Sequence, residues 1–208
     1  MHPVSSDTPY QQIRAVYDAT TIRVYQAYSD AIADTALANG RFIAPPFKMA
    51  RMTWIKPSFL WMMYRAGWGR KDAHQKRILA IDISREGFDW ALEHSCLSNH
   101  SRDFSRKDDW ARVRGTPIRI QWDPERDLLL RPLAFRAIQI GIGKEAVELF
   151  VHEWTRRITD ITGFAHSLHE LVSSDKLDEA RNLLPEERPY TVSRAIGERL
   201  GVSQPAET

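Results

Sequence analysis

The sequence is poor in cysteine and in long apolar runs. Its single cysteine is Cys96, so the chain can form no internal disulfide, and a reducing, cytoplasmic setting is expected. No stretch reaches the roughly 18 consecutive apolar residues that a membrane-spanning helix requires. The first residues also lack the basic and then apolar segments of a secretory signal. We therefore expect a cytoplasmic protein that has no membrane partner.

The common signatures of catalysis and phosphate binding are missing as well. The chain contains no GxxxxGK[ST], GxGxxG, HExxH or GxSxG motif. His166 and His169 stand three residues apart in an expected helix, but no second pair of ligands stands at a recognised metal spacing. We therefore predict no metal site, and a candidate active site must be argued from individual side chains.

Acidic residues are scarce in one stretch and abundant in another. Between Arg41 and Arg77 there are nine basic residues and a single acid, Asp72. From Glu145 onward there are twelve acids and seven bases, although the formal net charge of the whole chain is only +2. This separation suggests an anionic partner for the first stretch. The alternatives are that the two stretches face each other or that the bases are simply solvated.

Periodicity and turn residues predict an α+β fold with a mixed or antiparallel sheet. We expect strands over residues 21–28, 51–55, 78–83, 118–122 and 136–142, and a turn over residues 123–127. We expect helices over residues 30–39, 58–68, 84–97, 144–159, 163–173, 176–184 and 191–200. Residues 13–200 should form one compact domain, with an α+β core over 13–143 and a helical extension over 144–200. Residues 1–12 should be a flexible arm, and residues 98–116 a long exposed loop.

Polar side chains in the expected strands are candidates for ligand contact. In residues 21–28, alternation places Arg23 and Tyr25 on one face and Gln26 on the other, with apolar neighbours. Gln139 likewise shares a face with apolar residues of its strand. A buried polar group without hydrogen bonds costs about 1–3 kcal/mol. Each of these side chains should therefore join a network in the core or contact a ligand.

Residues 52–68 combine large rings with cations and contain no acid. The body of this segment is apolar around most of a helix, so it should be buried. Polar and aromatic residues at its ends and edges are candidates for ligand contact. These are Trp54, Lys56, Ser58, Tyr64 and Arg65. Rings beside cations can stack on a base or a nicotinamide while the cations bind phosphates.

Several segments resemble a known family. "IRVYQAYS", "RMTWIKPSFLWMMYRAGW", "QKRILAIDISREGF", "QWDPERD" and "RAIQIGI" are similar to the domain-of-unknown-function family numbered 4291, over about residues 12–200. This resemblance implies a single compact domain and brings no established activity with it.

A weaker likeness connects the chain to the ADP-ribosyltransferase fold. That likeness implies NAD as the cofactor, with Arg23 on the first strand holding it and residues 52–68 lining the nicotinamide pocket. The carboxylate that orients the ribose in that fold would be Asp123 or Glu125, and the amide Gln139 is a third candidate for a catalytic residue. The sequence has Q-x-D at residues 121–123, where that fold has Q-x-E or E-x-E.

Three functions are compatible with these features. The first is an enzyme that binds NAD or another nucleotide, in which Arg23, Lys56 and Arg65 contact phosphates. The second is a nucleic-acid-binding module that uses the basic stretch. It would also use the basic residues of the expected loop, Arg102, Arg106, Lys107, Arg112 and Arg114. The third is a non-catalytic interaction protein, whose acidic residues 145–208 meet a partner.

Overall fold

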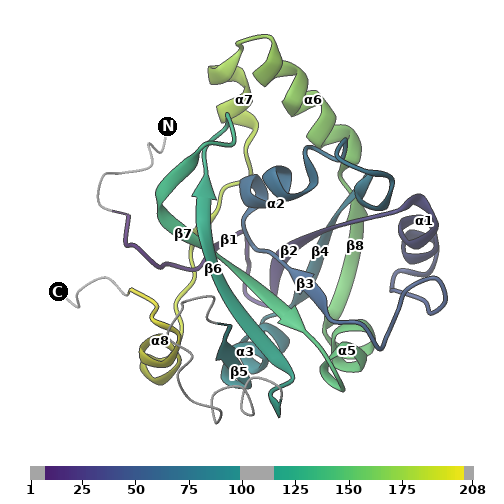
Figure 1. Cartoon of the computed structure of the whole chain (residues 1–208), viewed down its shortest axis with the longest axis vertical. Helices are drawn as coiled ribbons and strands as arrows, with labels where there is room; N and C mark the ends of the chain where they lie inside the picture. The colour runs from purple at the N-terminus through teal and green to yellow at the C-terminus, as the bar shows by residue number, and fades with distance from the viewer. Residues whose placement is uncertain (1–7, 99–114, 204–208) are drawn as a thin grey trace.

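The structure is a computed structural model and describes residues 8–98 and 115–203. Its helices and strands make an α+β fold, as predicted (Figure 1). The strands are β1 (Arg14–Ala15), β2 (Thr21–Tyr28), β3 (Thr53–Ile55), β4 (Arg77–Ser84), β5 (Ser95–Leu97), β6 (Ile118–Arg126), β7 (Pro132–Ile142), β8 (Thr155–Asp160) and β9 (Arg188–Pro189). The α-helices are α1 (Asp30–Asn39), α2 (Phe59–Ala66), α3 (Arg85–Glu93), α5 (Ala146–Leu149), α6 (Thr162–Ser173), α7 (Leu177–Leu183) and α8 (Arg194–Leu200).

The described part of the chain contains a short antiparallel pair, β1-β9, and two larger sheets. One has the strand order β2-β4-β8 and is antiparallel throughout. The other has the order β3-β7-β6-β5, in which only β5 runs parallel to its neighbour. The sheets meet where Tyr25 of β2 forms a single antiparallel bridge with Lys56, just after β3. In Figure 1, β3 accordingly lies between β2 and the long strands β6 and β7.

The apolar side chains form two clusters on opposite sides of the β2-β4-β8 sheet. Ile22 and Val24 of β2 belong to the larger cluster, together with isoleucines of β4, β6 and β7. Tyr25 belongs to the smaller cluster, which also contains the buried side of α2 and part of α6. Successive side chains of a strand point to opposite faces, so one strand supplies both clusters. The alternation predicted for residues 21–28 is therefore confirmed.

Helix α2 is held by signals that the sequence displays. The Ser58 hydroxyl accepts a hydrogen bond from the Trp61 backbone N–H at 3.1 Å, which caps the first turn. Gly67 ends the helix with a φ of 56°, a conformation that glycine adopts without steric cost. The helix side chains that are buried are Phe59, Trp61, Met62, Met63 and Ala66. The expectation of a buried helix body is confirmed.

Three predicted elements are wrong in part. The helix expected over 144–159 stops early, because residues 155–160 form β8, which pairs with β4. The β-branched residues Thr155, Ile158 and Thr159 favour a strand there. The helix expected over 84–97 ends at Glu93, and residues 95–97 pair with β6 as β5. Strand β6 continues to Arg126, so the turn expected over 123–127 begins only at Asp127.

The expected N-terminal arm is described only in part. Residues 1–7 lie outside the described residues, as do residues 99–114 of the expected loop. The next residues contact the sheet, because the Arg136 backbone N–H donates to the Tyr10 carbonyl at 2.8 Å and Gln11 bridges to Arg136. Gln12 is buried. The segment after residue 7 is therefore packed against β7.

Candidate functional site

A cleft of about 840 Å³ opens where β2 and β3 diverge. Gln26 joins the two strands there, since its amide nitrogen donates to Thr53 Oγ1 at 2.6 Å and to the Trp54 carbonyl at 3.1 Å. Gln26 thus uses its hydrogen bonds to hold one wall of the cleft. We call this cavity the basic cleft; its lining includes Gln26, Lys48, Arg51, Trp54, Lys56, Arg65, Asp72, Gln121 and Gln139.

Lys56 is the most unusual residue of the basic cleft. Lys56 is only 6% exposed. Its ammonium donates to the Trp54 carbonyl at 2.8 Å and lies 5.7 Å from the centre of the Trp61 ring. Burial, reinforced by the charge of Arg65, lowers the pKa of Lys56 to about 7, although Asp123 acts in the opposite direction. The amine of Lys56 therefore loses its proton more readily than that of an exposed lysine. An entering anion would favour the charged form.

The rim of the basic cleft is positively charged. Lys48, Arg51 and Arg65 are exposed, and Arg65 donates to the Gln75 side-chain oxygen at 3.2 Å. Asp72 is the acid among the described lining residues. A hydrogen bond from the Gln75 amide and another from a backbone N–H hold the pKa of Asp72 below its usual value. The cations thus outnumber the acid, which suits a ligand with one or more phosphates or carboxylates.

Trp54 supplies a half-buried ring beside these cations. Its strand partner is Gly141, and a Cβ at that glycine would lie 2.9 Å from two carbons of the indole and from the Met52 sulfur. The missing side chain at Gly141 therefore makes room for the ring. An indole held in this way can stack a flat heterocycle.

A chain of polar side chains crosses strands β6 and β7 at the cleft. Gln121 and Gln139 are direct cross-strand partners. The Gln139 amide donates to Gln121 Oε1 at 2.9 Å and to Asp123 at 2.6 Å. Asp123 is close enough for its charge to act on the pKa of Lys56. The structure therefore brings Gln139 together with Gln26, Trp54, Lys56 and Arg65 from the set predicted above in one cleft. Asp123 contacts Gln139 but is not itself among the residues that line the cleft.

The predicted residues Arg23 and Tyr25 line a different cavity, on the other face of β2. This second cavity has a volume of about 480 Å³. Arg23 makes a two-point ion pair with Asp82, at 2.8 and 3.1 Å, and Arg157 approaches the same carboxylate at 2.9 Å. Although burial raises the pKa of Asp82, the two arginines lower it below its usual value. Arg23 and Lys56 therefore do not share one cavity.

Ser58 and Glu125 form a buried pair beneath helix α2. The Ser58 hydroxyl donates to Glu125 at 2.8 Å, and both residues are at most 8% exposed. Glu187 joins them, because its carboxylate accepts from the Phe59 backbone N–H at 2.7 Å. Burial raises the pKa of Glu125, and burial together with Glu125 raises that of Glu187 to about 8. Neither Ser58 nor Glu125 lines either cavity, so they contribute no ligand contact there.

Tyr64 lies on the surface and is 42% exposed. The Arg126 guanidinium covers its ring at 3.6 Å from the ring centre. The ring therefore already has a cationic partner and is not part of the basic cleft.

Several charged residues at these sites are not singled out by the sequence, among them Lys48, Arg51, Asp82 and Glu187. Lys48 and Arg51 were counted only as part of the basic stretch. Asp82 could have been noticed as the one acid within the apolar strand "ILAIDI". Glu187 had no signal, since "PEER" has the appearance of an exposed turn. Over the described residues there is no group of three or more His, Cys, Asp or Glu side chains suited to a metal ion.

The comparisons with known proteins place the chain in a family. It matches the family described as "Domain of unknown function (DUF4291)" over residues 12–190, which is most of its length. The protein therefore belongs to this family, as the resemblance of its motifs implied. No curated protein matches it. In the part of the chain that the structure describes, no helix is long and apolar enough to cross a bilayer.

Proposed function

We propose that the basic cleft binds a nucleotide of the NAD class, and that the protein is a nucleotide-using enzyme of the ADP-ribosyltransferase type. The observation that carries the proposal is Lys56, an amine buried beside Arg65 and the Trp54 ring in one cleft. Lys56, Arg65 and the exposed Arg51 would contact phosphates, and Trp54 would stack a ring. The cleft volume of about 840 Å³ lies within the range of nucleotide-sized sites.

Asp123 is the carboxylate that this proposal requires. Transfer of ADP-ribose develops positive charge on a ribose carbon as the bond to nicotinamide breaks, and a nearby carboxylate stabilises that charge. Asp123 is oriented by Gln139 at 2.6 Å, next to Gln121. A protein or a nucleic acid would be the acceptor of the transferred group. A cytoplasmic location, inferred from the single cysteine, is part of the same proposal.

Calorimetric titration with NAD, ADP-ribose and adenosine tests the binding step. We expect NAD and ADP-ribose to bind more tightly than adenosine, because only they carry phosphates. Lys56→Met and Arg65→Gln should each weaken NAD binding about tenfold or more, which is about 1.4 kcal/mol. Lys176→Met is the control, since Lys176 is an exposed cation of the C-terminal part. Absence of NAD binding at millimolar concentration would contradict the proposal.

Release of nicotinamide from NAD tests the chemical step separately. Asp123→Asn should abolish the release and leave NAD binding within about threefold, because the amide keeps the shape and loses the charge. Release that is unchanged in Asp123→Asn would contradict the role of Asp123 and leave the binding proposal to its own test.

A nucleic-acid-binding module remains the second candidate, on the observation that Lys48, Arg51 and Arg65 are exposed around the cleft. The loop residues that would assist them, 102–114, lie outside the described residues. Binding of a short single-stranded RNA should then fall steeply with salt and weaken in Lys48→Gln. Salt-independent binding would exclude it. The third candidate, an interaction protein, is tested by light scattering after size-exclusion chromatography.

A further inference from the structure

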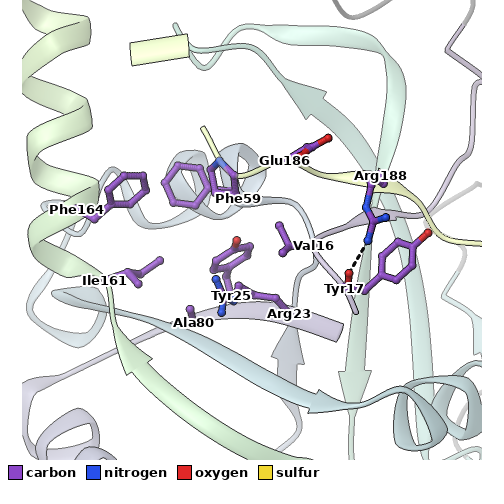
Figure 2. Close-up of a pocket in the computed structure, with 11 residues that line it drawn as sticks. Val16, Tyr17, Arg23, Tyr25, Phe59, Ala80, Ile161, Phe164, Glu186 and Arg188 are labelled. Atoms are coloured by element: carbon purple, nitrogen blue, oxygen red, sulfur yellow. Dashed lines mark hydrogen bonds between the residues drawn. The ribbon is translucent and has the colours of Figure 1, made fainter. Parts of the chain in front are cut away.

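The second cavity is open to solvent on one side and is lined by four parts of the fold, as Figure 2 shows. Strands β2 and β4 form its floor, with Arg23, Tyr25 and Ala80. Phe59 of α2 lies above, and Ile161 and Phe164 close one end. Glu186 and Arg188, which follow α7, stand at the other end. A volume of about 480 Å³ is large enough for a small organic molecule.

Tyr25 has an unused hydroxyl in this cavity. The residue is 1% exposed, and its hydroxyl has no hydrogen-bond partner among the described residues. In Figure 2 the hydroxyl points away from strand β2, towards the side of Phe59. Burial raises the pKa of the phenol, so the group keeps its proton and is available as a donor. Unpaired buried hydroxyls are uncommon because they lose their hydrogen bonds to water.

The two arginines around the cavity already have partners. Arg23 is held at two points by Asp82. Arg188 donates to the Tyr17 carbonyl at 2.6 Å and lies 4.4 Å from the centre of the Tyr17 ring. An anionic ligand would have to compete with Asp82 for Arg23. An anion would also meet the exposed carboxylate of Glu186, and a cation would meet the guanidinium groups of Arg23 and Arg188, so the lining favours a ligand without charge.

Aromatic rings make up much of the cavity wall. Phe59 lies 5.5 Å from Tyr25 at an interplanar angle of 76°, and 5.7 Å from Phe164 at 55°. Phe164 is 37% exposed, so this row of rings reaches from the buried hydroxyl to the surface. Edge-to-face walls of this kind accommodate a further ring favourably. We propose that the second cavity is a binding site for a small neutral aromatic molecule, whose carbonyl or ring nitrogen accepts a hydrogen bond from Tyr25.

This site is separate from the basic cleft and does not depend on the proposed nucleotide function. Tyr25 and Gln26 are neighbours in β2, and their side chains enter the two cavities from opposite faces. Substitutions that remove only the hydroxyl of Tyr25 should therefore leave the cleft unchanged. Conversely, Lys56→Met should leave the second cavity unchanged.

Three probes distinguish the features of the ligand. Acetophenone has a ring and a carbonyl acceptor, ethylbenzene has the ring without an acceptor, and benzoate has the ring with a negative charge. Binding of each to the full chain is measured by titration in two-dimensional NMR. We expect acetophenone to bind about tenfold more tightly than ethylbenzene, the effect of one buried hydrogen bond. Benzoate should bind more weakly than acetophenone.

Tyr25→Phe is the decisive variant, because it keeps the ring and removes a hydroxyl that has no hydrogen-bond partner among the described residues. It should unfold at the same urea concentration as the wild type or at a higher one. It should bind acetophenone about tenfold more weakly and ethylbenzene unchanged. Phe164→Ala should weaken both probes, and Lys56→Met should weaken neither.

Several outcomes would overturn the proposal. One is that acetophenone and ethylbenzene bind the wild type equally tightly. Another is that neither probe binds at millimolar concentration. A third is a lower urea midpoint for Tyr25→Phe, which would show that the hydroxyl has a partner within the folded protein. Tighter binding of benzoate than of acetophenone would assign the site to an anion at Arg23 instead. Each of these results leaves the nucleotide titration of the basic cleft unaffected, so failures of the two proposals are distinguishable.

Discussion

Replacing Lys56 by methionine should make the protein more stable at neutral pH. In the unfolded chain the amine keeps its ordinary pKa of 10.5, whereas burial lowers it to about 7 in the folded protein. Each unit of this difference corresponds to about 1.4 kcal/mol, so keeping the lysine costs the folded state on the order of 4 kcal/mol at pH 7. Methionine preserves most of the side-chain length and volume and cannot carry a charge.

The substitution should leave few new defects. The Trp54 carbonyl, which accepts from Lys56, also accepts from the Gln26 amide at 3.1 Å. It therefore keeps one donor when the lysine is removed. Allowing for lost packing and for relaxation around the amine, we expect Lys56→Met to raise the free energy of unfolding by about 2–4 kcal/mol at pH 7.

The pH dependence gives the sharper test. Between pH 7 and 10.5 the unfolded lysine is protonated and the folded one is not, so the unfolded state binds more protons. The stability of the wild type should therefore rise towards that of Lys56→Met by about 1.4 kcal/mol per pH unit over this window. Urea unfolding of both proteins at pH 7, 8 and 9 measures the difference. Lys176→Met replaces an exposed lysine, so its free energy of unfolding should change with pH in parallel with that of the wild type. Parallel curves for Lys56→Met and the wild type would refute a buried amine with a lowered pKa.

Three further predictions concern the packing around the two cavities. Asp82→Asn should lower the free energy of unfolding by about 1–3 kcal/mol, because it leaves Arg23 and Arg157 without their shared carboxylate. In the same urea experiment, Glu198→Gln, in the exposed pair with Arg194, should change the free energy of unfolding by less than about 0.5 kcal/mol. Ser58→Ala should lower the free energy of unfolding by about 1–3 kcal/mol, because it removes both a helix cap and a donor to buried Glu125. Ser193→Ala removes an exposed cap alone and should lower the free energy of unfolding less; equal losses for the two variants in thermal unfolding would argue against the Glu125 contact. Glu187→Gln should stabilise the protein more at pH 8 than at pH 5. A carboxyl whose pKa is raised from 4.5 in the unfolded chain to about 8 in the folded protein destabilises the folded state increasingly as the pH rises across that window. A difference in the free energy of unfolding between the two proteins that does not change with pH would contradict this prediction.

The sequence predicted the local features of the fold well. Strand β2 and helices α1 and α6 begin and end within a residue or so of their predicted limits, because alternation, caps and glycines mark them. Strand β8 was assigned to a helix, since residues 155–160 alternate weakly and gain their strand conformation by pairing with the distant β4. Periodicity within one segment cannot report such pairing.

The candidate site was predictable in its composition but not in its grouping. Trp54, Lys56 and Arg65 are indicated by residues 52–68, which combine rings and cations without an acid, and these three residues do line one cleft. The sequence also marked Arg23 and Glu125, which the fold places elsewhere. Arg23 is paired with Asp82, 59 residues further along the chain, and Glu125 is paired with Ser58, 67 residues away. Contacts of this range follow from the tertiary fold, which no local pattern encodes.

The alternation of side chains along β2 has a consequence for how this protein can change over generations. Tyr25 faces the second cavity and Gln26 faces the basic cleft, so a single inserted or deleted codon within β2 would exchange the linings of the two compartments. Substitutions can alter either compartment independently, but a change in strand length alters both together. We therefore expect β2 to keep a constant length in living relatives, while variation in length accumulates in the segments that connect the strands.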